Sequence, residues 1–149
     1  MPDELELYFE DFTVGRVFRS GTCEVTAEEI KEFAAKYDPQ FFHLDEEAAK
    51  SSFFDGLAAS GWLTAALTMR LRVETIAVAG GMIGAGLDEM RWTQAVRPGD
   101  TLRMETEVLS ARRSHSRPEY GVVRTRTITY NQRDEPVMRS VVNMLAPVR

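Results

Sequence analysis

Cysteine and histidine are scarce in this sequence, and their scarcity argues against two kinds of site. The single cysteine, Cys23, rules out an internal disulfide bond. The two histidines and this cysteine do not recur at the spacing of zinc ligands. Cys23 falls in a predicted strand with no histidine near it in the sequence, so we expect a buried, unreactive thiol rather than a nucleophile.

Long hydrophobic runs and massed positive charge are also lacking. The longest apolar run, residues 61–69, contains Thr64 and Thr68 and is far too short to span a bilayer. A net charge of −5 and a pI near 5.1 offer no electrostatic surface for nucleic acid or an anionic membrane. The acidic residues 1–6 do not resemble a signal peptide, so the sequence predicts a cytoplasmic protein.

What is present is the composition of one globular domain. The chain has 149 residues, of which 44% are hydrophobic, enough for one buried core spanning residues 1–149. Thr26 and Glu29 form a capping box that opens a predicted helix ending at Tyr37. A short second helix is predicted over residues 46–50.

A long helix is predicted over residues 59–78, and Gly80 and Gly81 end it. Its first half is apolar on nearly every side, which is typical of a helix buried all round. Its second half carries charged side chains, and we expect that end to reach the surface. These side chains are Arg70, Arg72 and Glu74.

The rest of the chain has the pattern of β-strands. Residues 16–25 read as a strand, and residues 101–108 alternate apolar and polar side chains with a period of two. Residues 120–130 are rich in Val, Thr and Ile. One face of a last strand is lined by Met138, Ser140, Val142 and Met144. The simplest way to bury the long helix is to wrap one antiparallel sheet around it, so the fold class is α+β.

The segment from Asp38 to His43 holds the most suggestive chemistry. A carboxylate and an imidazole can together activate a water molecule near neutral pH. Pro39 disfavours a helix at Asp38, and Phe41 and Phe42 indicate a packed, non-helical segment between two helices. The alternative is structural, with Asp38 ending one helix and His43 preceding the next.

Three segments carry a resemblance to a known family. Residues 38–43 read Asp-Pro-Gln-Phe-Phe-His, which is similar to the signature of the MaoC-like (R)-specific enoyl-CoA hydratases. Residues 59–61 resemble the family's second conserved patch, and residues 96–102 resemble the turn before a central strand of the hotdog fold. The resemblance implies one hotdog domain, and it covers residues 12–146.

The resemblance also implies roles for the residues that carry it. Asp38 and His43 would add water syn across a 2-enoyl thioester, giving an (R)-3-hydroxyacyl product. Gln40 stands where many family members have Asn and would help to orient the site. The substrate would be a thioester of coenzyme A or of acyl carrier protein, as in fatty acid metabolism, with no further cofactor and no metal.

Ser60 and Gly61 stand at the predicted start of the long helix, where backbone N–H groups have no helical partner. The Gly61 N–H is therefore a candidate for stabilising the developing enolate oxygen. The alternative is a packing glycine at a contact between helix and sheet. The resemblance implies substrate-binding positions for both residues.

Three arginines near a strand end can grip phosphate and are candidates for binding coenzyme A: Arg112, Arg113 and Arg117. Ordinary solvated charge is the alternative for all three. His115 lies in the same polar loop and is predicted to be a surface residue. Trp62 and Trp92 are predicted to lie in the core or at an interface rather than against a cofactor.

Two other functions are compatible with the sequence, and the resemblance also implies an oligomeric state. A hotdog acyl-CoA thioesterase usually needs a carboxylate in or opposite the long helix, and the first acid of this helix is Glu74. A non-catalytic acyl-CoA-binding subunit would have little use for a desolvated Asp38 beside His43. A lone hotdog sheet has open edges, so the resemblance implies a homodimer that pairs them.

Overall fold

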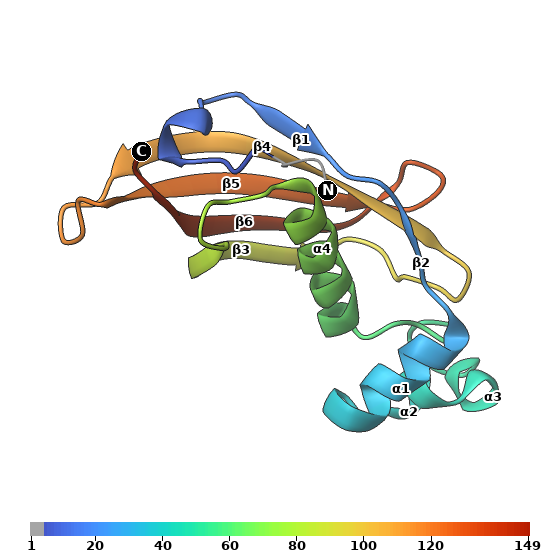
Figure 1. Cartoon of the computed structure of the whole chain (residues 1–149). Coiled ribbons are helices and arrows are strands. Elements are labelled where there is room, and N and C mark those ends of the chain that lie inside the picture. Colours follow the sequence, from blue (N-terminus) through green and yellow to red (C-terminus); the bar gives the residue numbers. More distant parts are fainter. Residues whose placement is uncertain (1–4) are drawn as a thin grey trace.

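One antiparallel sheet of six strands forms most of the molecule, in a computed structural model that describes residues 5–149. Its strands are β1 (Val17–Arg19), β2 (Cys23–Glu24), β3 (Ile83–Trp92), β4 (Thr101–Arg113), β5 (Tyr120–Tyr130) and β6 (Pro136–Pro147). They lie in the order β1-β4-β5-β6-β3, and β2 also pairs with β4. The sheet curves along one central helix, α4 (Gly61–Thr75), as Figure 1 shows. The predicted sheet around a helix is confirmed.

Three further helices lie beyond one end of the sheet (Figure 1). They are α1 (Ala27–Tyr37), α2 (Phe41–Leu44) and α3 (Glu46–Ala49), and a 3-10 turn, η1 (Phe9–Asp11), precedes the sheet. The predicted cap of α1 is present, because the Thr26 hydroxyl accepts a hydrogen bond from the Glu29 N–H at 3.1 Å. These helices bring the Asp38–His43 segment to the amino-terminal end of α4.

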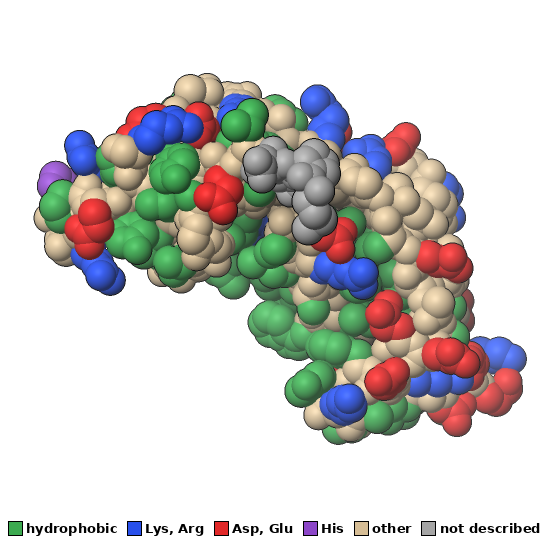
Figure 2. Space-filling model, in the orientation of Figure 1, with side chains coloured by type: hydrophobic (Ala, Val, Ile, Leu, Met, Phe, Trp, Pro, Cys, Tyr) green, Lys and Arg blue, Asp and Glu red, His purple; other side chains and the backbone are tan. Residues whose placement is uncertain are grey.

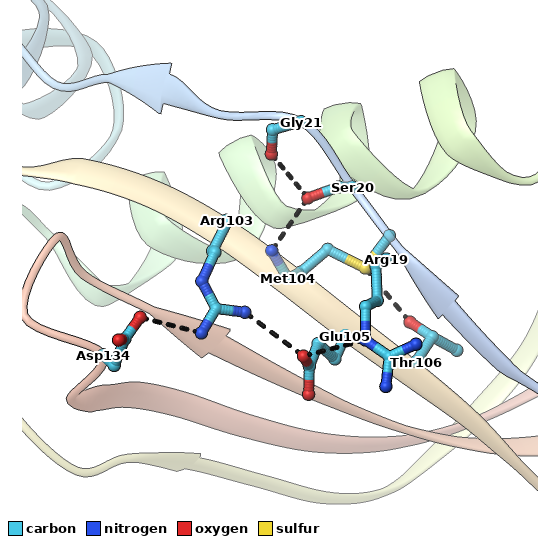
Figure 3. Close-up of polar contacts among 8 residues, drawn as sticks. All are labelled: Arg19, Ser20, Gly21, Arg103, Met104, Glu105, Thr106 and Asp134. Carbon is cyan, nitrogen blue, oxygen red and sulfur yellow. Dashed lines mark hydrogen bonds and ion pairs between the residues drawn. The ribbon is translucent and has the colours of Figure 1, made fainter.

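The predicted strand over residues 16–25 is wrong in its continuity. The Ser20 hydroxyl accepts a hydrogen bond from the Met104 N–H at 2.8 Å and donates one to the Gly21 carbonyl at 2.7 Å (Figure 3). A side chain therefore takes a donor on β4 that a regular strand would bind with its backbone. The chain consequently pairs with β4 as two short strands, β1 and β2.

The long helix is shorter than predicted at both ends. Ser60 caps it by accepting a hydrogen bond from the Trp62 N–H, so the helix starts at Gly61 rather than at residue 59. After Thr75, the backbone of residues 77–79 exchanges hydrogen bonds with Leu7 at 2.7 and 2.9 Å, which replaces the expected last turn. Within residues 5–149, no helix is long and apolar enough to cross a bilayer.

The interior contains two apolar clusters along α4. The first packs α1 and the start of α4 on the sheet and includes Ile30, Leu63 and Leu102. The second lies near the end of α4 and includes Phe12 and Ile76. Cys23 packs against the first cluster but is only partly buried, and this burial raises the pKa of its thiol.

Charged side chains on the outer face of the sheet pair with one another at the surface. Arg19 and Glu105 are 3.3 Å apart, and Arg103 lies 2.9 Å from Asp134 (Figure 3). Exposed pairs of this kind contribute about 0–1 kcal/mol each. These ion pairs therefore contribute little to the stability of the fold.

Arg72 contradicts the prediction that the second half of α4 reaches the surface. Arg70 and Glu74 are exposed and paired at 2.9 Å, whereas Arg72 is only 4% exposed. Its Nη2 donates to the Thr125 hydroxyl at 3.3 Å, and its Nε has no partner among the described residues. Burial lowers the pKa of this guanidinium. A largely unpaired buried cation is a cost to the folded state.

Replacing Arg72 with Met should therefore stabilise the protein. Methionine can follow the path of the arginine stem without burying a charge, and we expect the free energy of unfolding to rise by about 1–3 kcal/mol. Urea denaturation would measure this change. The matched control is Arg70→Met, on the exposed side of the same helix, which should shift stability by less than about 0.5 kcal/mol. A lower stability of the Arg72 variant would contradict this reading.

Candidate active site

The end of α1 positions Asp38. The helix stops at Tyr37, and the Asp38 N–H still donates to the Ala34 carbonyl at 2.9 Å, so Asp38 forms the helix C-cap. Pro39 then turns the chain into α2, whose single turn contains His43. The predicted non-helical segment is therefore wrong for residues 41–43, because the proline affects only the residues next to it. The structural alternative also holds locally, since Asp38 ends α1 and His43 precedes α3.

The carboxylate of Asp38 is held on both oxygens. Its Oδ2 accepts a hydrogen bond from the Ser60 hydroxyl at 2.7 Å, and its Oδ1 accepts one from the Gln40 amide at 2.5 Å. Burial alone would raise the pKa of this carboxyl, but the hydrogen bonds from Gln40 and Ser60 lower it below its ordinary value. Asp38 is therefore an ionised, oriented carboxylate at neutral pH.

His43 is almost fully buried, and its surroundings fix its tautomer. Its Nδ1 lies 2.6 Å from the Ala58 carbonyl oxygen. A carbonyl can only accept, so Nδ1 carries a proton. Nε2 then faces Asp38 Oδ2 at 3.3 Å. The rings of Phe42 and Phe54 pack against the imidazole at 4.5 and 5.9 Å between centroids and fix its plane.

Ser60 links the carboxylate to the start of α4. Its hydroxyl donates to Asp38 and accepts from the Trp62 N–H at 3.2 Å, so the helix cap and the carboxylate share one side chain. Gly61 is the first residue of α4. Its N–H belongs to the first turn, where N–H groups lack intrahelical acceptors and the helix dipole is positive. This end of the helix suits a developing negative charge.

Gly61 also has a packing role. A Cβ built at this position would lie 2.5 Å from Cε2 of Trp92, at the end of β3. The Trp92 indole N–H donates to the Gly61 carbonyl at 2.8 Å. The contact between helix and sheet thus requires glycine here regardless of any part in catalysis.

A cavity of about 510 Å³ opens at this end of the molecule. His43, Phe54, Gly61, Thr64, Trp92 and Arg97 are among the residues that line it. These residues come from α2, the loop before α4, α4 itself, the end of β3 and the segment between β3 and β4. The cavity therefore joins the imidazole to the helix start, and the wall combines apolar rings with a few polar groups.

The three candidate arginines for coenzyme A lie elsewhere in the chain. Arg112 and Arg113 end β4, and Arg117 follows in the hairpin to β5, at the end of the sheet far from α1–α3 (Figure 1). Arg117 pairs with Glu119 at 3.3 Å, and Arg112 and Arg117 border a separate hollow with His115. Within one chain, these arginines do not meet the Asp38–His43 site, and their binding of coenzyme A stays a prediction.

Trp62 and Trp92 are not core residues, which corrects part of that prediction. They are 58% and 43% exposed, and their rings meet edge to face at 5.3 Å between centroids beside the cavity. Their place at an interface stays a prediction.

Arg97 is the residue that sequence reasoning missed. The Arg-Pro-Gly-Asp segment predicts only a turn, yet the Arg97 side chain lines the cavity and binds the loop before α4. The turn residues predict only the local path of the backbone. Nothing in the local sequence indicates that this arginine binds a loop some 41 residues away.

A curled antiparallel sheet around a central helix defines a hotdog-fold protein, here with a polar pair at the helix start. Residues 11–131 match the family model of the MaoC like domain, and the chain belongs to this MaoC-like dehydratase family. The resemblance seen in the sequence is thereby confirmed.

Known proteins share much of this sequence and its fold. YdeM of Bacillus subtilis (strain 168) is 33% identical over 137 residues, covering 91% of this chain and 96% of YdeM. The MaoC-like dehydratase from Rhodospirillum rubrum is 50% identical, with a TM-score of 0.92 over 96% of this chain and 98% of that one. The unliganded R-hydratase PhaJ1 from Pseudomonas aeruginosa is 26% identical, with a TM-score of 0.78 over 97% of this chain and 88% of that one.

Proposed function

We propose that the protein is an (R)-specific enoyl-CoA hydratase, or equally a 3-hydroxyacyl-thioester dehydratase. One observation carries the proposal: Nε2 of His43, on the cavity wall, faces Asp38 Oδ2 at 3.3 Å while Nδ1 donates to Ala58. With a neutral imidazole, both facing atoms are acceptors. A water molecule that donates one hydrogen to each would satisfy both.

Such a water is poised to attack C3 of a 2-enoyl thioester. Asp38 and His43 take one proton from it and return one to C2, so atoms and charge balance without a redox or metal cofactor. Charge develops on the thioester oxygen as the C3–O bond forms, and the Gly61 N–H stabilises it. Ser60 and Gln40 hold the carboxylate in place. The reverse sequence dehydrates the 3-hydroxyacyl thioester.

Two other functions fit the site less well. A thioesterase needs a carboxylate aimed at the thioester carbonyl, but Glu74, the first acid of α4, is exposed and paired with Arg70. A non-catalytic acyl-CoA-binding subunit gives no reason to bury His43 and partly desolvate Asp38. The proposed hydratase uses both His43 and Asp38.

A panel of trans-2-enoyl-CoA and enoyl-acyl carrier protein substrates tests the proposal. Hydration removes the absorbance of the conjugated enoyl thioester, whereas thioester hydrolysis releases a free thiol. The proposal predicts the first change without the second. Thiol release alone would support the thioesterase, and binding without either reaction would support the non-catalytic subunit.

We also propose a homodimer. The side of α4 away from the sheet exposes Trp62, Met69 and Val73, and Figure 2 shows apolar side chains gathered over this helix. The edge strand β3 exposes Ile83 and Leu87 beside it. A second copy that pairs along β3 would extend the sheet and cover this α4–β3 surface.

Sedimentation at micromolar concentration should accordingly give twice the chain mass. Val73→Lys places a charge in the α4–β3 surface and should shift the protein toward monomer. Val14→Lys is the matched control, since Val14 is 70% exposed and lies outside that surface. A wild-type protein that sediments as a fully active monomer would contradict the dimer.

A further inference from the structure

Arg97 makes an unusual set of contacts for an arginine. Its Nη1 donates to the carbonyls of Gly56 and Leu57 at 3.1 and 3.3 Å, and its Nη2 donates to the carbonyl of Phe54. Among residues 5–149, no carboxylate lies within 4.0 Å of its guanidinium. Both terminal nitrogens of the guanidinium therefore donate to the backbone of one loop.

This loop needs such a partner. Asp55 and Gly56 both have positive φ, at 54° and 142°, and the resulting tight path turns three carbonyl dipoles toward one point. A planar guanidinium can satisfy several converging oxygens at once and offset their mutual repulsion. The hydrogen bond from the Gly56 N–H to the Ala49 carbonyl, at 3.0 Å, fixes the other side of the turn.

The same loop controls His43. Ala58 follows directly after the bound carbonyls, and its own carbonyl accepts from His43 Nδ1 at 2.6 Å. The Ala58 N–H returns a hydrogen bond to the Phe42 carbonyl at 3.1 Å, and the Phe54 ring packs on the imidazole. A shift of this loop would move the acceptor that keeps the proton on Nδ1.

We propose that Arg97 is a positioning residue for His43. By holding the carbonyls of Phe54, Gly56 and Leu57, it keeps the Ala58 carbonyl on Nδ1, so that Nε2 remains the unprotonated atom facing Asp38. This inference rests on the proposed hydratase function for its catalytic consequence. Its structural part, the tautomer of His43, is independent of any substrate.

The tautomer can be measured directly by ¹⁵N NMR of the imidazole without substrate. Wild type should show His43 protonated on Nδ1, and Arg97→Ala should show a mixture of both tautomers. Turnover of an enoyl thioester should fall about 10²-fold, with KM little changed, because a small displacement of a catalytic group is costly. Added guanidinium should restore part of both properties.

Two further variants keep the test decisive. Arg103→Ala is the matched control, because Arg103 is partly buried, as Arg97 is, but its partners are the carboxylates of Glu105 and Asp134. This variant should change neither the tautomer nor turnover. If Arg97→Ala does not fold, Arg97→Lys retains the charge but not the fork, and it should still shift the tautomer toward a mixture.

The inference is overturned if His43 stays protonated on Nδ1 in the folded Arg97 variants. A rise in KM alone, with the tautomer unchanged, would also overturn it, because Arg97 would then contact the substrate directly. A shifted tautomer in a protein that hydrates no enoyl thioester would support the positioning role while refuting the proposed function.

Discussion

Asp38→Asn and His43→Ala should each lower the turnover of an enoyl thioester by about 10²- to 10⁴-fold, the usual contribution of general acid–base catalysis. Asparagine cannot take a proton from water. Alanine removes the second acceptor, His43 Nε2, which lies 3.3 Å from the Asp38 carboxylate in the wild-type protein. The double variant should be little worse than either single one, because the two side chains act on one water molecule as a unit.

Steady-state kinetics on the three variants would measure this non-additivity, and thermal melting would confirm that they fold. Asp45→Asn is a matched control, because Asp45 caps α3 through the Ala48 N–H at 2.9 Å and asparagine caps equally well. His115→Ala, in the hairpin beyond β4, controls for loss of a histidine. Near wild-type hydration by either site variant would refute the catalytic assignment.

A backbone ester that replaces only the Gly61 N–H should lower turnover by about 10²- to 10³-fold, as loss of one oxyanion donor does. The hydrogen bond strengthens as the enolate charge develops, so substrate affinity should change much less than turnover. A side-chain substitution cannot make this test, since a Cβ at Gly61 would collide with Trp92.

The comparison needs a semisynthetic protein of native sequence, assembled by the same ligation. Both proteins should melt cooperatively, with the ester somewhat less stable, because its Ser60 carbonyl is a weaker acceptor for the Leu63 and Thr64 N–H groups. Unchanged turnover in the ester would leave Gly61 with its packing role alone.

The sequence predicts the architecture well where periodicity is strong. The alternation along β4 correctly places Leu102, Met104 and Val108 inside, and the cap at Thr26 correctly starts α1. It fails where a distant partner decides. Ser20 breaks a strand because Met104 is opposite, and α4 stops at Thr75 because Leu7 pairs with the residues beyond it.

The candidate site shows the same division. Sequence motifs predict five site residues, and the structure brings them together around one helix start: Asp38, Gln40, His43, Ser60 and Gly61. Their chemical roles remain predictions. The local sequence does not predict the burial of Arg72 or the loop contacts of Arg97. Both depend on segments that meet only in the folded chain.

The stereochemistry of hydration in D₂O tests the central claim most directly. Asp38 and His43 meet at one point, so they can deliver oxygen and proton only to the same face of the double bond. NMR of the product of a trans-2-enoyl-CoA should show the (R) configuration at C3, with deuterium at C2 added syn to the hydroxyl. An (S) product, or addition of deuterium from the opposite face, would contradict the account.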